Sequence, residues 1–166
     1  MSFGIRPPLP QDAEALTAMA CQPGVAQGLG ILTVAGPDWV KARLEKRDPN
    51  SYAFVAVVEG NAVGWVRLIR LTDRKSHSAT LEIAVRDDLH GKGVGRALLR
   101  EALDIADNGL GLLRIELEVF CDNPAAQALY ESEGFVIEGT RRGVIRSAGV
   151  LVDAHIMARY TDGEAA

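Results

Sequence analysis

A glycine-rich run near the middle of the chain has the residue types needed to bind an anion. The run is His90-Gly91-Lys92-Gly93-Val94-Gly95-Arg96, and it separates an apolar stretch, 81–85, from a helical pattern, 94–106. Glycines let the backbone approach a ligand closely, and the unpaired N–H groups of a first helical turn attract phosphate with the help of the helix dipole. Lys92 and Arg96 add formal positive charge. The run therefore predicts a phosphate-binding turn, with a loop that only caps a helix as the alternative.

Two familiar phosphate-binding motifs do not fit this run. A P-loop needs a lysine followed by Ser or Thr, whereas Lys92 is followed by Gly93, Val94 and Gly95. A dinucleotide-binding turn needs a third glycine where Leu98 stands, and a βαβ unit around it. The expected phosphate group is therefore held by a different kind of turn.

A second group of polar side chains follows an expected strand at 113–120. Asn123 suits the N-cap of a helix and Pro124 suits its first position, so a helix is predicted from residue 125 to about 132. Tyr130 lies near the end of that helix. Its phenol is a proton donor at neutral pH, although a tyrosine in a core with a satisfied hydroxyl is the alternative.

Together the two segments resemble the GNAT superfamily of acetyl-CoA-dependent N-acetyltransferases. The pattern is His90-x-x-Gly93-x-Gly95, then Asn123-x-x-Ala126-x-x-Leu129-Tyr130-x-x-x-Gly134-Phe135, with His90 where the family usually has Gln or Arg. The segments 22–25, 76–77 and 134–140 look like the bacterial amino-acid and phosphinothricin-type members. The resemblance covers most of the chain. It implies a single GNAT-like α/β (α+β) domain over residues 1–166, with a mixed, mostly antiparallel central sheet flanked by helices on both faces.

The resemblance also assigns a cosubstrate, acetyl-CoA, and residues that hold it. Pantetheine is expected along Ile83, Ala84 and Val85 like an added strand, with a backbone N–H near Val85 serving the thioester oxygen. The pyrophosphate is expected on the turn formed by His90, Gly91, Lys92, Gly93, Val94, Gly95 and Arg96, to which His90 contributes mainly its backbone. Asn123 is expected to orient the cofactor or the Tyr130 helix. Tyr130 is expected to protonate the departing thiolate.

Glu82 is the candidate general base, because it interrupts an apolar strand just before the glycine-rich run 90–96, called the glycine turn below. The attacking amine must be neutral, and a buried glutamate can acquire a pKa suited to accepting its proton. Relatives of the phosphinothricin kind carry an acid at the position of Thr80, two residues earlier and on the same strand face. A solvent-facing or interface Glu82 that only pairs with a cation is the alternative, and deprotonation through water without a dedicated residue stays open.

The acceptor predicted from the resemblance is the primary amine of a small molecule, best matched by an L-amino acid or an analogue. The apolar segment 29–34 suits an apolar side chain, so Leu29 and Ile31 are candidate substrate contacts. His77 is a third candidate, with a surface histidine as the alternative. The Arg141-Arg142 pair either binds a carboxylate or a CoA phosphate, or forms a solvated basic patch. The alternative functions are a phosphinothricin-type detoxifying acetyltransferase, a protein N-terminal acetyltransferase and a weakly catalytic acyl-CoA-binding regulatory module.

The composition excludes several other classes of protein. The chain has 166 residues, 48% of them hydrophobic, a net charge of −4 and a pI near 5.4. These values suit one soluble domain and argue against binding to nucleic acid or to an anionic membrane surface. Residues 1–10 lack the apolar core of a signal peptide, and no apolar run is long enough to span a bilayer. We therefore expect a cytoplasmic protein with Cys21 and Cys121 as reduced thiols and no metal site. A homodimer is the expected assembly.

The elements that must position these residues follow from hydrophobic periodicity and turn signals. Strands are predicted at about 4–7, 52–58, 62–71, 80–85, 113–120, from 135, and at 152–159. Helices are predicted up to residue 20, from Pro37, at 94–106 and at 125–132, with loop or short helix at 22–35 and a loop at 72–78. Strands first and then alternating strands and helices indicate a mixed sheet with helices packed on it.

Overall fold

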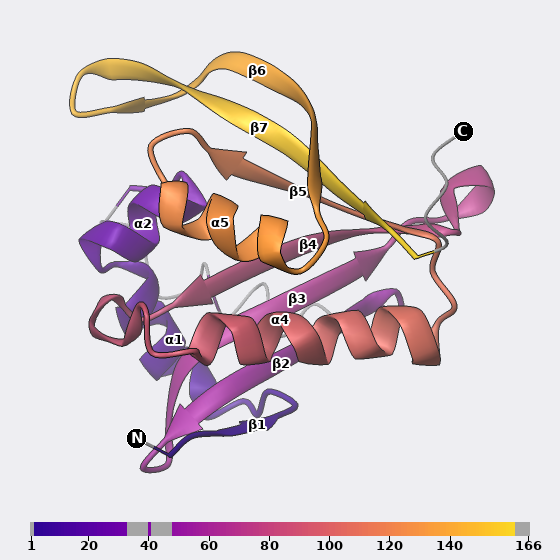
Figure 1. The fold of residues 1–166 in the computed structure, drawn as a ribbon. Helices are drawn as coiled ribbons and strands as arrows, with labels where there is room; N and C mark the ends of the chain where they lie inside the picture. The colour runs from indigo at the N-terminus through magenta and orange to yellow at the C-terminus, as the bar shows by residue number, and fades with distance from the viewer. Residues whose placement is uncertain (1, 33–39, 41–47, 162–166) are drawn as a thin grey trace.

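The computed structural model describes residues 2–32, 40 and 48–161 of the chain. In these residues a seven-stranded sheet has the order β1-β2-β3-β4-β5-β7-β6 (Figure 1). The strands are β1 (Gly4–Arg6), β2 (Ser51–Val58), β3 (Asn61–Arg70), β4 (Ser78–Val85), β5 (Arg114–Phe120), β6 (Val136–Ser147) and β7 (Val150–Tyr160). Neighbouring strands are antiparallel except β4 and β5, which are parallel. The sheet is therefore mixed and mostly antiparallel, which confirms the predicted fold class.

Helices cover both faces of the sheet, as predicted. One face carries α1 (Asp12–Ala20) and α2 (Pro23–Leu29), and the other carries α4 (Val94–Asp104) and α5 (Pro124–Ser132) (Figure 1). In α4 the buried residues Val94, Leu98, Leu99, Ala102 and Leu103 form one stripe, which is the spacing of an amphipathic helix. The α-helix ends at Asp104, two residues earlier than predicted, and a π-helical turn, Ile105–Gly109, follows it directly.

Two hydrophobic cores lie on opposite faces of the same strands. Ala56, Val66 and Val85 belong to the first core, under α4 and α5, whereas their neighbours Val55, Trp65 and Ala84 belong to the second core, under α1 and α2. Successive side chains of a strand point to opposite faces, so each central strand supplies both cores. The near-continuous apolar runs of β2, β3 and β4 follow from this double burial.

The segment 22–35 contains a helix in its first half, in agreement with one of the two alternatives for it. Pro23 lies in the first turn of α2, and Gly30 ends the helix in the left-handed region with a φ of 66°. Residues 33–35 and nearly all of the helix expected from Pro37 lie outside the described residues.

The closing strand of the C-terminal hairpin is longer than predicted. β6 and β7 span 136–147 and 150–160 around a turn at Ala148 and Gly149, whereas the sequence predicted a strand from 135 without a stated end and a closing strand at 152–159. Most of β6 is exposed, because it is the edge strand of the sheet, and an exposed strand gives a weak periodic signal. β4 likewise begins two residues earlier than predicted, at Ser78, after a short 3-10 turn at Asp73–Lys75.

Candidate active site

The parallel strands β4 and β5 separate after a short paired stretch. Their register joins Ser78–Thr80 to Arg114–Glu116 and stops there, although β4 remains paired with β3 as far as Val85. Beyond the Thr80–Glu116 pair, β5 therefore offers no ladder partner to the edge of β4. Backbone N–H and C=O groups need partners, so an extended chain that enters this split can bind β4 as an additional strand.

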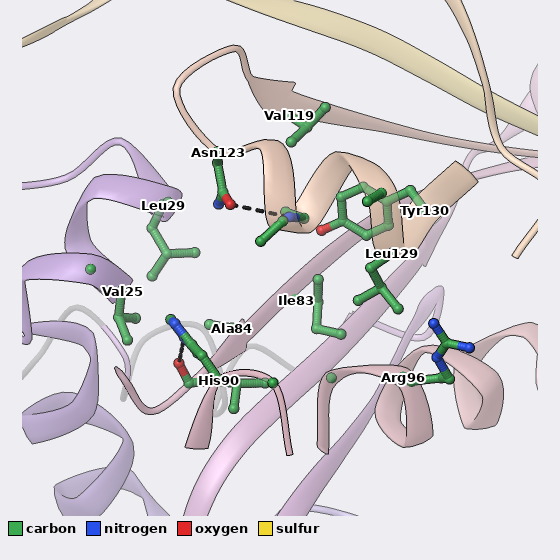
Figure 2. Close-up of a pocket in the computed structure, with 18 of the residues that line it drawn as sticks. Val25, Leu29, Ile83, Ala84, His90, Arg96, Val119, Asn123, Leu129 and Tyr130 are labelled. Carbon is green, nitrogen blue, oxygen red and sulfur yellow. Dashed lines mark hydrogen bonds between the residues drawn. The ribbon is translucent and has the colours of Figure 1, made fainter. Parts of the chain in front are cut away.

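A cavity of about 480 Å³ occupies the split (Figure 2). Eleven residues that the sequence analysis assigned to the site line it: Leu29, Ile83, Ala84, Val85, His90, Gly91, Gly93, Gly95, Arg96, Asn123 and Tyr130. They come from α2, β4, the glycine turn, the start of α4 and the region of α5. The tertiary structure thus brings together segments about 100 residues apart in the sequence, in one concave site typical of ligand binding.

The glycine turn leaves open space at the N-terminus of α4. Gly91 and Gly93 have φ values of 72° and 85°, and a Cβ at either position would meet no atom within 4 Å. Gly93 is the N-cap and forms no side-chain cap, so the N–H groups of the first turn face the cavity mouth without a capping side chain. Two predicted turn residues lie outside the cavity lining: Lys92 is exposed, and Val94 is fully buried in the first core.

His90 contributes its side chain as well as its backbone. Its ring Nε2 lies 2.8 Å from the carbonyl oxygen of Val85 (Figure 2). The sequence predicts mainly a backbone role for His90, since nothing in the local sequence indicates that the turn folds back onto the end of β4. The contact links the glycine turn to the last residue of the split strand.

Tyr130 is buried, with 7% of its surface exposed, and its ring packs on Phe135 with ring centroids 5.9 Å apart. Its hydroxyl points toward the middle of the cavity (Figure 2) and forms no hydrogen bond within the described residues. Burial raises the pKa of the Tyr130 phenol well above its ordinary value. The group therefore stays protonated across the neutral range and can donate a proton or a hydrogen bond.

Asn123 is the N-cap of α5, as predicted. Its Oδ1 accepts a hydrogen bond of 3.1 Å from the N–H of Ala126 (Figure 2), and Pro124 lies in the first turn. This cap fixes where α5 begins, and with it the position of Tyr130 two turns later. Asn123 also lies on the cavity wall, so its position suits both expected roles, orienting the cofactor and orienting the helix of Tyr130.

Glu82 lies beside the cavity and does not line it. It is half-buried on β4, opposite Arg67 of β3, on the face that carries α1 and α2. The cavity wall instead carries Glu118 of β5, which the sequence analysis did not select. Because Thr80 pairs with Glu116, the next positions on the same face are Glu82 and Glu118, on either side of the split. Polar residues at 114, 116 and 118 alternate with buried ones in β5. This alternation is the sequence signal that could have identified Glu118 as a residue on the open face of the strand.

The three predicted substrate contacts lie in different places. Leu29 lines the cavity, whereas Ile31 packs against the second core just after α2. His77 is exposed and precedes β4 at the end opposite to Val85, away from the cavity lining. Val25 of α2 and Phe120 of β5 also line the cavity and were not predicted.

Contacts from both sides of the split hold α2 over it. The N–H of Gly24 donates to Asp87 Oδ2 at 3.0 Å, and the N–H of Asp87 donates to the Gln22 side chain, also at 3.0 Å. From the other side, Gln27 Nε2 donates to Asp122 Oδ2 at 2.8 Å. α2 therefore spans the ends of β4 and β5 and forms a wall of the cavity.

No group of three or more His, Cys, Asp or Glu side chains that could hold a metal ion occurs in the described residues. Within that same part of the chain, no helix is long and apolar enough to cross a membrane.

Comparison with known proteins gives consistent matches. The model of the family described as "Acetyltransferase (GNAT) family" matches residues 32–135. The L-amino acid N-acetyltransferase AaaT of Escherichia coli (strain K12) is 37% identical over 153 residues, which cover 90% of this chain and 92% of that protein.

Solved structures resemble the whole fold. A crystal structure provisionally named as a phosphinothricin N-acetyltransferase has a TM-score of 0.84 and 26% identity, and covers 96% of this chain and 98% of its own. Spermidine N-acetyltransferase from Vibrio cholerae, crystallised with CoA and spermine, has a TM-score of 0.83 and 26% identity, with 96% of each chain covered.

Proposed function

The chain belongs to the GNAT acetyltransferase family, and from that premise we propose that it transfers the acetyl group of acetyl-CoA to the primary amine of a small L-amino acid or a close analogue. The observation that carries this proposal is the cavity in the β4/β5 split. The glycine-rich turn, whose open backbone suits an anion, lies at one end of the cavity, and a carboxylate, Glu118, lies on its wall. The similarity to an L-amino acid N-acetyltransferase supports the substrate class.

The residues present fit the cosubstrate. The left-handed glycines leave open space at the N-terminus of α4, where the helix dipole and N–H groups suit a pyrophosphate. The edge of β4 beyond Thr80 has no ladder partner in β5, which suits the amide groups of a pantetheine chain, although His90 contacts the carbonyl oxygen of Val85. Arg96 lines the same end of the cavity and adds positive charge.

Acetyl-CoA supplies a thioester whose carbonyl carbon a neutral amine can attack. In the proposed reaction, backbone N–H groups at the end of β4 stabilise the negative charge that develops on the carbonyl oxygen. Glu82, directly or through water, accepts the proton that the amine loses. Tyr130 donates a proton to the sulfur as the carbon–sulfur bond breaks. The products are the N-acetylated amine and free CoA thiol.

Release of CoA thiol from acetyl-CoA with a panel of amines tests the proposal. The panel contains L-amino acids, phosphinothricin, short peptides with a free N-terminus and a polyamine. We expect the highest kcat/KM with an L-amino acid or an analogue that retains the α-carboxylate. Preferred turnover of peptides would favour a protein N-terminal acetyltransferase. CoA binding without turnover of any amine would favour the regulatory module.

We further propose that the protein acts as a cytoplasmic homodimer. β6 is an edge strand, and exposed apolar residues on the hairpin, Val136, Ile137, Val150 and Leu151, support association. Sedimentation equilibrium should give twice the chain mass of 17.8 kDa. A mass of one chain at micromolar concentration would contradict this assembly.

A further inference from the structure

Glu118, which lines the cavity, forms an ion pair with a residue of the edge strand β6. Its Oε2 accepts a hydrogen bond of 2.6 Å from Nη1 of Arg141 on β6. Among the described residues that line the cavity, Glu118 is the single carboxylate. The pair thus lies at the edge of the proposed acceptor site, where a substrate can reach it.

The sheet register places Arg141 on the face of the sheet that carries α2. Arg141 is opposite Ala154 of β7, and Ala154 is opposite Phe120 of β5, so the three share one face. Phe120 lies directly under Gly30 at the end of α2. An irregularity in β6 begins just after Arg141, where the N–H of Gly143 donates to Asp153 Oδ1 at 2.8 Å, and such bulges reorient neighbouring side chains.

The Glu118–Arg141 pair leaves hydrogen-bonding atoms unused, unlike three other arginines of the described residues, Arg6, Arg159 and Arg114. Arg6–Asp12 and Arg159–Asp107 use two nitrogens and both carboxylate oxygens, and Arg114 contacts two glutamates and a tyrosine. Arg141 uses one of its five N–H donors, and Glu118 Oε1 accepts no hydrogen bond from the described residues. An exposed ion pair with a single contact contributes little to stability, so a ligand can displace it at a small cost in free energy.

We propose that Glu118 and Arg141 form the acceptor subsite that distinguishes α-amino acids from other amines, with Glu118 receiving the α-ammonium group and Arg141 the α-carboxylate. An α-amino acid carries both charges next to each other, as the pair does. The free Oε1 of Glu118 and the free guanidinium donors of Arg141 supply the hydrogen bonds. This inference rests on the proposed function, whose substrate class it explains.

The test compares the best L-amino acid substrate with its carboxamide, which keeps the amine and lacks the carboxylate. kcat/KM is measured for both at saturating acetyl-CoA, in the wild type, Arg141→Gln, Glu118→Gln and the control Arg142→Gln. Arg142 is exposed, adjacent in sequence and loses the same charge. Thermal unfolding and CoA affinity of each variant establish that the fold and the cofactor site are intact.

Arg141→Gln should lower kcat/KM for the amino acid by about 10- to 100-fold, the effect of losing a hydrogen bond to a charged group, and should leave the carboxamide nearly unaffected. Glu118→Gln should lower kcat/KM for both substrates, and Arg142→Gln should preserve the wild-type ratio. An unchanged acid-to-amide ratio in Arg141→Gln, or an equal loss in Arg142→Gln, would overturn the subsite and leave the proposed function standing. A wild type that acetylates only amines without a carboxylate would overturn both.

Discussion

Tyr130 combines a ring fixed in the first core with a hydroxyl that faces the cavity. Replacing it by Phe keeps the packing on Phe135 and removes the proton donor alone. We expect Tyr130→Phe to lower kcat by about 10²–10⁴-fold, the usual contribution of general acid catalysis, with little change in acetyl-CoA affinity. Single-turnover kinetics with calorimetric CoA binding measures both quantities.

The control for this variant is Tyr160→Phe. The Tyr160 hydroxyl bonds to Glu138 and Arg114, away from the cavity lining, so its loss should lower stability and leave kcat near the wild-type value. Equal kcat values for Tyr130→Phe and the wild type, with chemistry rate-limiting, would show that Tyr130 has only a packing role.

Glu82 can be tested through the pH dependence of the rate. If Glu82 accepts the amine proton, Glu82→Gln should lower kcat/KM, and the loss should shrink at high pH, where more of the amine is already neutral. An ion-pairing role predicts something else: a lower melting temperature with near-normal turnover of the folded enzyme. pH–rate profiles and thermal unfolding of the same variant separate the two roles, and an unaltered profile would favour deprotonation through water alone.

At the scale of single elements, the glycine turn owes its shape to residues that can adopt positive φ. Gly93 has a φ of 85° and Gly149, in the β6–β7 turn, has a φ of 83°, and a Cβ added at either position would meet no atom within 4 Å. Both Gly93→Ala and Gly149→Ala should cost about 1–2 kcal/mol of stability, because the left-handed conformation is strained for L-residues. Only Gly93→Ala should weaken CoA binding. Equal CoA affinities in the two variants, measured by calorimetry, would argue against the phosphate site.

The first strand and the first helix are joined by the Arg6–Asp12 pair, with contacts of 2.7 and 2.8 Å. Hydrogen bonds from Arg6 lower the pKa of buried Asp12 below its ordinary value of 3.8. A carboxyl whose pKa is lower in the folded state stabilises the protein above the ordinary pKa, and this stabilisation is lost as the pH falls through the folded value. Asp12→Asn should therefore cost about 2 kcal/mol at pH 7.

The difference in unfolding free energy between wild type and Asp12→Asn should shrink as the pH falls below the ordinary carboxyl pKa of 3.8. Urea unfolding at a series of pH values measures this. Asp88→Asn is the control, because the Arg86–Asp88 pair is exposed and should contribute little. A difference that does not vary with pH would mean that ionised Asp12 is not the source of the stability.

At the scale of the whole molecule, we expect the two cores to unfold together, because each central strand contributes alternate residues to both. Leu98→Ala in the first core should cost about 3 kcal/mol. Its unfolding curve should still be one transition when followed by circular dichroism and by tryptophan fluorescence, which reports in part on Trp65 of the second core. Two separate transitions would contradict the single domain proposed for this chain.

The sequence by itself determined the local features of the site. The glycine turn, the Asn123 cap, the helix that carries Tyr130 and the types of most elements depend on residues within a few positions of each other. Backbone preferences, caps and hydrophobic periodicity act over such distances, so these features could be predicted without knowledge of the fold.

The tertiary structure alone decided which distant residues meet. The β4/β5 split depends on strand pairing between residues 78–80 and 114–116, and the position of Glu118 opposite Glu82 follows from that register. The contact of Arg141 with Glu118 joins residues 23 positions apart in the sequence. The hydrogen bond from Gly24 of α2 to Asp87 joins residues 63 positions apart. No local preference encodes such contacts, because they arise only when burial of the two cores fixes which strands are neighbours and in which register.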